Sequence, residues 1–401
     1  KQRTPFKWDI PFERSTLFTA VDVTGKFATY EAADTWYPTW GSDGKLYSPW
    51  TDGRVKDLRS SSACHDASCV TTTGFATIEG EDPMSLNITN VGLVKASTLP
   101  YHGRYPCGSL HVDSIWFYGT YALDNENHEP GFGDQMNSSR AGYCENWCIQ
   151  GPFLGFRWSK DDGKTWNEPR EVLKGYDDSL FGEAAPNNHS KVKFGAPHVV
   201  DLGQGLQYRP AGDNEKMMYL IGHGASSPFS PLSWMQGSEI YLARAVPKIE
   251  VVNNRSAWEF YGDGQWHRGD VHMAKPIVSW GNRTGVTTMT YIEKVKRYIV
   301  CVSTPTYSPF TEKQFDTYLL ESENITGPFR YISYLREFGP QAYFVNIPSK
   351  FIGDFDPQDG SLKLFLSYSA NFAFHGGPAR PEGSGYHWTL QEVILRKDSH
   401  P

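Results

Sequence analysis

The chain has 401 residues, with 38 Lys and Arg against 45 Asp and Glu, and a formal net charge of -7 at neutral pH. This acidic balance argues against a nucleic-acid partner, because phosphates require a basic face. A hydrophobic content of 39%, with 14% aromatic residues, excludes a disordered chain. No apolar run reaches the ~18 residues that a membrane-spanning helix needs, so we expect no membrane contact.

The predicted elements are short strands rich in β-branched and aromatic residues, separated by Gly, Pro, Asn and Asp turns. The strands recur in pairs that share one plan. The first strand opens with a small or polar residue and Pro, and a turn follows. The second strand ends in an aromatic-rich or Ser/Gly-rich stretch. In chain order the pairs are Thr35–Trp40 with Gly44–Tyr47, Arg104–Leu110 with Trp116–Tyr121, Phe194–Val200 with Met218–Gly222, Gly285–Tyr291 with Arg297–Val302, and Ala342–Lys350 with Leu362–Ser369.

Radially repeated sheets of this kind predict an all-β fold, a β-propeller that forms a single domain over residues 1–401. The best helix candidate, Phe310–Leu320, is short and unconvincing. The spacing of the pairs is uneven, so the pattern leaves the number of blades open.

One motif is sharp. Ser159-Lys-Asp-Asp-Gly-Lys-Thr-Trp166 matches the Asp-box pattern S-x-D-x-G-x-T-W. Its Ser and Asp side chains should bond the backbone of a turn, its Gly should adopt an unusual φ, and its Trp should pack beneath. The motif therefore predicts a structural turn on the outside of a blade and carries no chemistry.

Several features predict a secreted protein. The chain begins at Lys1 without an apolar signal core, so we expect that a signal peptide has been removed. Six N-x-S/T sequons are candidate glycosylation sites: Asn87, Asn137, Asn188, Asn254, Asn282 and Asn324.

The close cysteine pairs Cys64/Cys69 and Cys144/Cys148 suit short disulfides in an oxidising compartment. Metal ligation is the weaker alternative, because neither pair has a second pair at the spacing of a zinc site. Cys107 and Cys301 lie in strand-like runs and could be buried thiols or a third bridge.

A propeller gathers the ends of its inner strands at one face, so polar residues near strand starts in different blades are the candidate site. These candidates are His102, Arg104 and Tyr105 in one run, His198, His223 between two glycines, Tyr343 and Lys350 in another run, and Asn371. Each also has a structural interpretation, such as a core aromatic or a turn histidine. Their recurrence in different blades favours a site.

A glycoside hydrolase would instead need two carboxyl groups, one acting as acid and one as base or nucleophile. Asp34, Asp43, Asp52 and Glu239 are the candidates. Asp43 and Asp52 each precede a glycine and are typical of turns. No pair of carboxylates in the sequence is as well supported as a candidate site as the histidine-rich set.

The chain resembles a known family in a series of segments that run from about Thr35 to Phe372. They are Tyr37–Trp40 with Ser42–Tyr47, Arg104–Gly108, Lys193–His198, Gly222–Ala225, Lys275–Ile277, Thr287–Tyr291, Ile325–Phe329, Gln341–Lys350 and Tyr368–Phe372. In these segments it is similar to the fungal and bacterial rhamnosyl-glucuronate lyases, which remove terminal rhamnose from glucuronate in gum-arabic-type polysaccharides. The resemblance implies seven blades with the site on one face, and five or six blades stay open.

The chemistry of β-elimination suits the histidine-rich set. Neutralising the uronate carboxylate acidifies the C5 proton, which a base removes while an acid protonates the departing O4. His102 and His198 are therefore the acid/base candidates, with Tyr343 as an alternative. Arg104 and Lys350 would bind the carboxylate. The remaining predicted sugar contacts are His223, Asn371, Tyr105 and the stacking residues Trp40 or Trp50.

The sequence thus predicts a secreted, monomeric lyase that acts on an acidic, glucuronate-containing polysaccharide. No cofactor is required, and a bound Ca²⁺ stays open. The alternatives are a propeller glycoside hydrolase of the arabinan- or sialidase-like type and a non-catalytic, lectin-like propeller.

Overall fold

The computed structural model describes residues 10–62, 71–96, 103–124, 149–167, 179–183, 192–226, 234–306, 314–339, 341–370 and 380–398. Within these ranges the chain is nearly all β, as predicted. The exceptions are the four-residue helix α2 (Ile249–Val252) and the 3-10 turns η2 (Arg255–Ala257), η3 (Val271–Met273) and η4 (Ser349–Phe351). The segment Phe310–Leu320 is not helical where it is described, because strand β19 (Phe315–Ser322) begins there.

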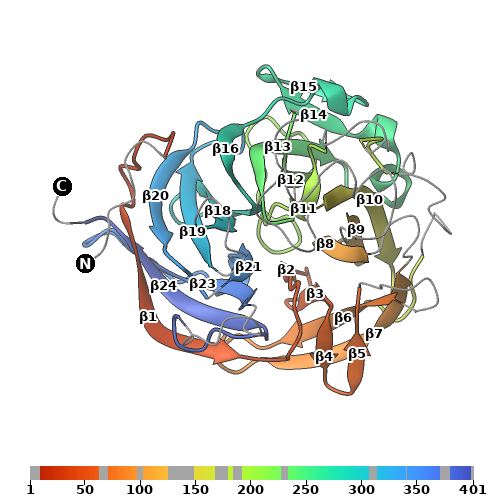
Figure 1. Cartoon of the computed structure of the whole chain (residues 1–401), viewed down its shortest axis with the longest axis horizontal. Helices are drawn as coiled ribbons and strands as arrows, with labels where there is room; N and C mark the ends of the chain where they lie inside the picture. Colours follow the sequence, from red (N-terminus) through yellow and green to blue (C-terminus); the bar gives the residue numbers. More distant parts are fainter. Residues whose placement is uncertain are drawn as a thin grey trace, which may run out of the picture.

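The strands form five sheets arranged around an axis, which are the blades of a β-propeller (Figure 1). Blade I contains β2 (Thr39–Trp40), β3 (Leu46–Trp50), β6 (Thr71–Glu79) and β7 (Asn87–Ala96). Blade II contains β8 (Gly103–Val112), β9 (Ile115–Asp124) and β10 (Ile149–Ser159). Blade III contains β11 (Gly195–Val199), β12 (Met218–Gly224), β13 (Gly237–Ala245) and β16 (Val278–Thr284).

Blade IV contains β17 (Val286–Ile292), β18 (Arg297–Pro305), β19 and β20 (Arg330–Leu335). Blade V contains β21 (Ala342–Asn346), β23 (Ser361–Ala370), β24 (Thr389–Arg396) and β1 (Ala20–Thr29), and β22 (Phe355–Asp356) pairs with β23. Two hairpins extend blades III and I: β14 (Glu259–Gly262) with β15 (Gln265–Arg268), and β4 (Gly53–Val55) with β5 (Leu58–Ser60).

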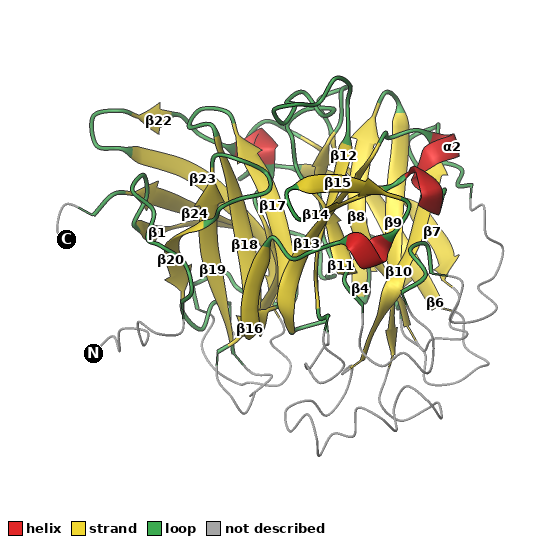
Figure 2. Ribbon diagram, turned by 90° about the horizontal axis from the view of Figure 1, so that it is seen from above, coloured by secondary structure: helices red, strands yellow, loops and turns green. Residues whose placement is uncertain are grey.

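The five predicted strand pairs are the first two strands of the five blades, so the recurring pattern in the sequence is confirmed. The seven blades implied by the family resemblance are not what the described residues show, because these residues form five blade sheets. The first strand of each blade lies nearest the axis, and the strands run between the two faces of the ring (Figure 2).

Three inner strands carry a bulge. The register shifts between Cys107 and Ser109 in β8, between Gly195 and His198 in β11, and between Tyr343 and Asn346 in β21. A residue with positive φ lies in each shift: Gly108 at 27°, Ala196 at 39° and Phe344 at 57°. A bulge bends its strand and redirects its side chains. The bulges therefore redirect side chains in the inner strands of blades II, III and V.

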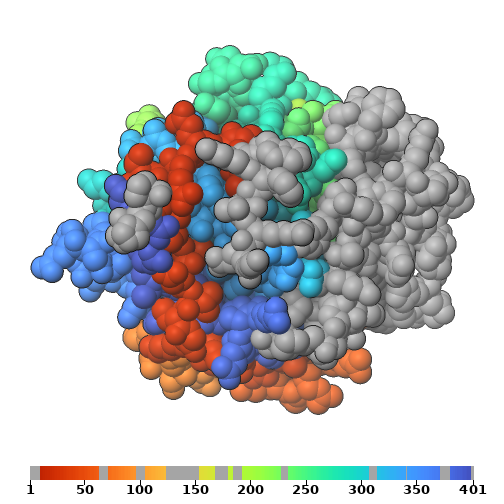
Figure 3. Space-filling view, turned by 60° about the vertical axis from the view of Figure 1, so that its left-hand side comes forward, coloured from red at the N-terminus to blue at the C-terminus, as the bar shows by residue number. Residues whose placement is uncertain are grey.

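The ring closes by pairing the two ends of the described chain. Strand β1 completes blade V by pairing antiparallel with β24, and the two strands lie together along the side of the molecule (Figure 3). Beyond them, the Tyr30 amide donates to the Trp388 carbonyl and the Trp388 amide donates to the Glu31 carbonyl. Trp388 stacks on Trp36 of blade I with ring centroids 5.2 Å apart. We call this junction of blades V and I the closure seam.

Cys107 and Cys301 are buried free thiols in blades II and IV, which settles the choice that the sequence left open. The predicted disulfide cysteines Cys64, Cys69, Cys144 and Cys148 lie outside the described residues. Asn87, Asn254, Asn282 and Asn324 are exposed, whereas Asn137 and Asn188 are outside the described ranges. Glycosylation, secretion and a single domain stay predictions. No helix within the described ranges is long and apolar enough to cross a membrane.

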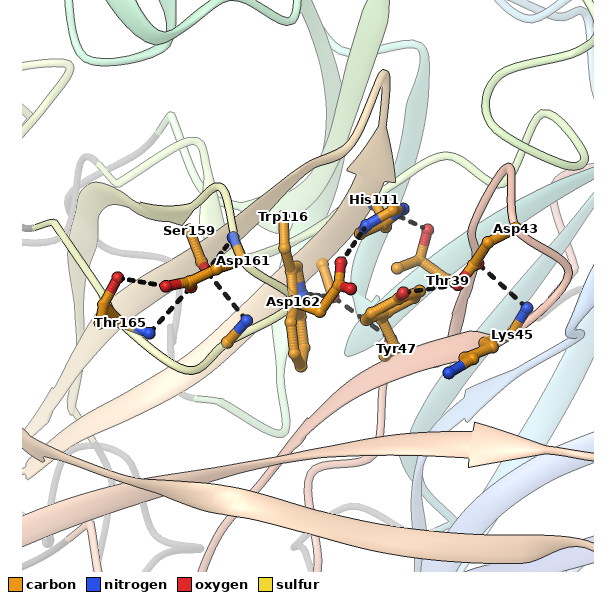
Figure 4. A network of polar contacts seen from close by, with 12 residues as sticks. Thr39, Asp43, Lys45, Tyr47, His111, Trp116, Ser159, Asp161, Asp162 and Thr165 are labelled. Atoms are coloured by element: carbon orange, nitrogen blue, oxygen red, sulfur yellow. Dashed lines mark hydrogen bonds and ion pairs between the residues drawn. The ribbon is translucent and has the colours of Figure 1, made fainter.

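The Asp-box forms the predicted turn after β10 (Figure 4). The Ser159 hydroxyl donates to Asp161 and accepts from the Gly163 amide at 2.8 Å, while the Thr165 amide donates to Asp161 at 2.8 Å. The next residue, Asp162, contacts His111 of β8, whose Nε2 lies 3.2 Å from Asp162 Oδ1, and the His111 ring stacks on Tyr47 of blade I with ring centroids 3.9 Å apart. The motif is therefore structural and ties blade II to blade I.

Replacing Asp161 with Ala should lower the unfolding midpoint in denaturant at pH 7. Hydrogen bonds from Thr165 and Ser159 lower the pKa of Asp161 to about 2. A folded pKa below the ordinary value means that this stabilisation is complete above about pH 4 and is lost as the pH falls toward 2. The wild type and the variant should therefore converge near pH 2, and an equal difference at both pH values would contradict this assignment.

Candidate active site

Two carboxyl groups lie at one end of blade I. Asp34 precedes β2 and Asp52 follows β3, and an antiparallel bridge between Asp34 and Thr51, with two backbone bonds of 2.9 Å, joins these segments. Asp52 has a positive φ of 47°. The next residue must be Gly53, because a Cβ there would lie 2.1 Å from the Ala32 carbonyl oxygen. The Asp-Gly turn that the sequence predicts is thus real, and it also presents the second carboxyl.

The Asp34 carboxyl is almost buried, with 7% of the residue exposed. Its Oδ1 accepts from the Thr35 hydroxyl at 2.7 Å, and its Oδ2 lies 2.9 Å from the hydroxyl oxygens of both Tyr343 and Tyr386. Burial, and then the charge of Asp52, raises the pKa of Asp34 to about 8. Asp34 therefore keeps its proton at neutral pH.

Asp52 is partly exposed and is more strongly hydrogen bonded as an anion. Its Oδ1 accepts from the Ser62 amide at 2.7 Å and from the Thr51 hydroxyl at 3.3 Å, and Tyr105 bonds its carboxyl. Burial raises its pKa, while the Ser62 amide and the hydroxyl groups lower it. The two carboxyls therefore lie in different environments, and differences of this kind separate the acid from the base in catalytic pairs.

Five tyrosines from blades I, II and V surround the pair: Tyr37, Tyr105, Tyr121, Tyr343 and Tyr386. Burial raises the pKa of each phenol above its usual value, and the charge of Asp34 or Asp52 adds to the shift. These phenols stay protonated, so they can donate hydrogen bonds and cannot serve as bases near neutral pH. This includes Tyr343, for which the sequence left an acid/base role open.

His198 of β11 lies in the same axial region, with its ring 4.7 Å from that of Tyr37. Its Nδ1 lies 2.8 Å from the Val199 carbonyl oxygen and must donate to it. Burial lowers the pKa of His198 to about 4, so the ring is neutral at pH 7 and has no imidazolium proton to give. His223 is fully buried in β12, opposite Gly195 and Ile240.

Most of the other predicted sugar contacts are buried or have structural partners. Arg104 is buried in β8, and its Nε donates to the Thr120 hydroxyl of the adjacent strand at 3.2 Å. Trp50 is fully buried, with its ring packed against Gly74, so it has no exposed face for a sugar. Trp40 ends β2, away from Asp34. Lys350 follows the far end of β21 and contacts Glu81 Oε1 at 2.8 Å and the Gly44 carbonyl at 2.5 Å.

His102 and Asn371 lie outside the described residues. Tyr105 and Tyr343 are the predicted site residues that the structure brings to the carboxyl pair. Tyr386 joins them without having been predicted. It lies between β23 and β24, more than 300 positions from Asp34, and no local motif marks it.

The remaining carboxyl groups have structural partners. Asp43 accepts from the Tyr47 hydroxyl at 2.8 Å in the β2–β3 turn, at the other end of blade I. Glu239 accepts from the Ser226 amide at 2.6 Å and from the Tyr241 hydroxyl at 2.5 Å. Burial raises the pKa of Glu183 to about 7, but the Lys193 and Phe194 amides occupy both of its oxygens. In the described ranges no three His, Cys, Asp or Glu side chains are grouped to hold a metal ion.

Comparison with known proteins finds no matching family model and no match among curated proteins. The fold is similar to that of solved structures. The GH43_1 enzyme from Xanthomonas citri has 12% identity and a TM-score of 0.44 over 93% of this chain and 90% of that chain. A GH62 hydrolase in complex with xylotriose has 7% identity and a TM-score of 0.42 over 91% and 92%. An endo-1,5-alpha-L-arabinanase from Thermotoga petrophila has 11% identity and a TM-score of 0.39 over 93% and 72%.

At these identities and TM-scores the likeness concerns the fold alone. The prediction of a rhamnosyl-glucuronate lyase is corrected here. The similar solved structures are glycoside hydrolases rather than lyases. Independently, the best-formed titratable group is the pair Asp34 and Asp52, whereas His198 is buried and neutral. The sequence analysis underrated this pair because the sequence does not show that distant tyrosines pack around the two carboxyls.

Proposed function

We propose that the chain is a glycoside hydrolase whose catalytic pair is Asp34 and Asp52. The observation that carries this proposal is the different environment of two neighbouring carboxyls. One is nearly buried beside two phenols and keeps its proton, and the other is partly exposed and bonded by an amide. Two carboxyl groups in opposite protonation states are what hydrolysis of a glycosidic bond requires.

In this mechanism Asp34 donates its proton to the departing glycosidic oxygen. Ionised Asp52, which is the more exposed of the two, supplies the carboxylate on the other side of the reaction. It either removes a proton from the attacking water or attacks the anomeric carbon itself. The anomeric configuration of the first product, followed by NMR, distinguishes these routes, because direct attack and a second displacement retain the configuration whereas water attack inverts it.

We infer that the substrate is an oligosaccharide or polysaccharide. The GH62 structure contains xylotriose, and the Thermotoga petrophila enzyme is named for arabinan, so xylan and arabinan fragments are suitable first probes. A glucuronate-containing glycan such as gum arabic belongs in the same panel, because an acidic substrate stays a prediction. Release of new reducing ends from any member supports the proposal, and no release from a broad panel contradicts it.

The rate should depend on pH through both carboxyls. Because burial raises the pKa of Asp34 to about 8, kcat/KM should hold its value up to about pH 8 and then fall about tenfold per unit as Asp34 loses its proton. The raised pKa of Asp52 should move the acidic limb above that of an ordinary aspartate. The measurement is kcat/KM against pH, and a rate that rises above pH 8 would rule out Asp34 as the acid.

Folding needs its own control in that experiment. A carboxyl whose folded pKa exceeds its unfolded value binds more protons in the native state, so it costs stability as the pH rises from about 4 to 8. Tryptophan fluorescence at each pH separates this loss of stability from the loss of the catalytic proton.

A further inference from the structure

The hydroxyl group of Tyr386 lies between two oxygen atoms. Its oxygen is 2.5 Å from the main-chain carbonyl oxygen of Asp52 and 2.9 Å from Oδ2 of Asp34. A phenol has one hydrogen, and a main-chain carbonyl has none to give. The shorter contact to Asp52 is therefore made with the hydrogen of Tyr386.

A lone pair of the Tyr386 oxygen is then left facing Asp34. An ionised carboxylate would oppose that lone pair with another, in a site where only 7% of Asp34 is exposed and little water can relieve the conflict. A proton on Asp34 Oδ2 removes the conflict, because Asp34 then donates to Tyr386.

The second phenol at Asp34 is that of Tyr343. The Tyr343 hydroxyl donates to the same Oδ2 at 2.9 Å, and its ring is enclosed by Trp234 and Phe344, with centroids 5.6 Å and 4.9 Å away. It is also close enough to Tyr386 to bond it. A donor to a carboxyl oxygen favours the ionised form.

We propose that Tyr386 is a positioning residue that accepts a hydrogen bond from Asp34 and so holds this carboxyl in its acid form, while Tyr343 donates to the same oxygen and opposes it. The two phenols have opposite effects on one proton. This deepens the proposed function, on which it rests only for the catalytic use of that proton. The bonding pattern itself follows from the contacts.

Other groups also face Asp34. Thr35 bonds it, and the charge of Asp52 raises its pKa. The charge of Asp34 in turn raises the pKa of the phenols of Tyr37, Tyr105 and Tyr121. Burial holds the pKa of all these phenols well above neutrality. Within the described part of the site, Asp34 and Asp52 are the carboxyl groups whose pKa burial raises, so a titration can be assigned by replacing either one.

The experiment is infrared spectroscopy of the full chain across pH, recording the carbonyl stretch that a protonated carboxyl has and a carboxylate lacks. The Asp34 band is identified as the one missing in Asp34→Asn and present in Asp52→Asn. Tyr386→Phe should move the titration midpoint of this band down by about one pH unit, and Tyr343→Phe should move it up by a similar amount, since one hydrogen bond to a charged group corresponds to about one unit.

Opposite shifts support the proposal, and shifts of the same sign, or none, overturn it. The wild type gives a test that needs no folded variant, because absence at pH 7 of any carbonyl band from a protonated carboxyl also overturns it. The readout does not depend on turnover. Opposite spectroscopic shifts in a protein that cleaves no glycan would contradict the proposed function alone. If the protein is active, the alkaline limb of kcat/KM should move with the band in each variant.

Discussion

Replacing Asp34 or Asp52 with Asn is expected to lower kcat by about 10²- to 10⁴-fold, the usual contribution of a general acid or base. Asn at position 34 cannot donate the proton, and Asn at position 52 cannot accept one. Each amide occupies nearly the volume of the carboxyl, and the Thr35 and Ser62 donors keep an oxygen to bond. The measurement is the initial rate of reducing-end release on the best substrate of the panel.

Asp43→Asn is the matched control, because Asp43 lies in the same blade at the other end and bonds only neighbouring turn residues among its described contacts. It should leave the rate within about twofold, the range expected for a change outside the catalytic machinery. Near-normal rates in both Asp34→Asn and Asp52→Asn, with intact folding, would show that the reaction uses other groups.

Replacing Trp388 with Ala should be the most destabilising single change at the closure seam, costing about 3–5 kcal/mol of unfolding free energy. Trp388 is fully buried, stacks on Trp36 and packs at a tilt against Tyr30, with both ring centroids 5.2 Å away, and donates from Nε1 to the Ser367 hydroxyl at 2.9 Å. Its loss leaves a cavity where blades V and I meet. Unfolding in denaturant, followed by circular dichroism, measures the effect.

Trp388→Phe should cost less than half as much unfolding free energy as Trp388→Ala, because a ring still fills the seam. Trp266→Ala on the partly exposed β15 is the control for removing an indole away from the seam. Tyr386 is two positions from Trp388, so Trp388→Ala should also reduce kcat/KM at temperatures where the protein is folded. An unchanged unfolding midpoint would show that this stacking does not hold the ring closed.

The fold was predictable because each blade repeats a local pattern. The five strand pairs follow from the alternation of β-branched and aromatic residues with turn residues, and they are the starts of the five blades. The count of seven came from the family resemblance, whereas the pattern itself contained five. The Asp-box turn was equally predictable from the sequence, because its hydrogen bonds join residues within a few positions of each other.

The site was less predictable because its chemistry depends on contacts that are distant in sequence. Asp52 was interpreted as a turn residue, which is correct, but the same turn also presents its carboxyl to Tyr105. The pKa of Asp34 depends on Tyr343 and Tyr386, more than 300 positions away. Conversely, the sequence suggested His198 as an acid or base, yet burial lowers its pKa to about 4 and leaves the imidazole neutral at pH 7.

The position of the pair also links activity to ring closure. Asp34 follows β1 by a few residues and Tyr386 precedes β24 by a few residues, and β1 and β24 are the strands that join the ends of the chain. The hydrogen bonds of Tyr343 and Tyr386 to Asp34 therefore cross the closure seam. We expect the acid form of Asp34 to depend on a closed ring.

The most direct test of the account is hydrolysis of the active glycan in isotopically labelled water, with mass spectrometry of the products. A glycoside hydrolase adds water across the bond, so the new reducing end should carry one labelled oxygen, and Asp34→Asn should abolish its formation. Products that carry no label at the cleaved bond and absorb in the ultraviolet as unsaturated uronates would contradict it, because elimination breaks the bond without water.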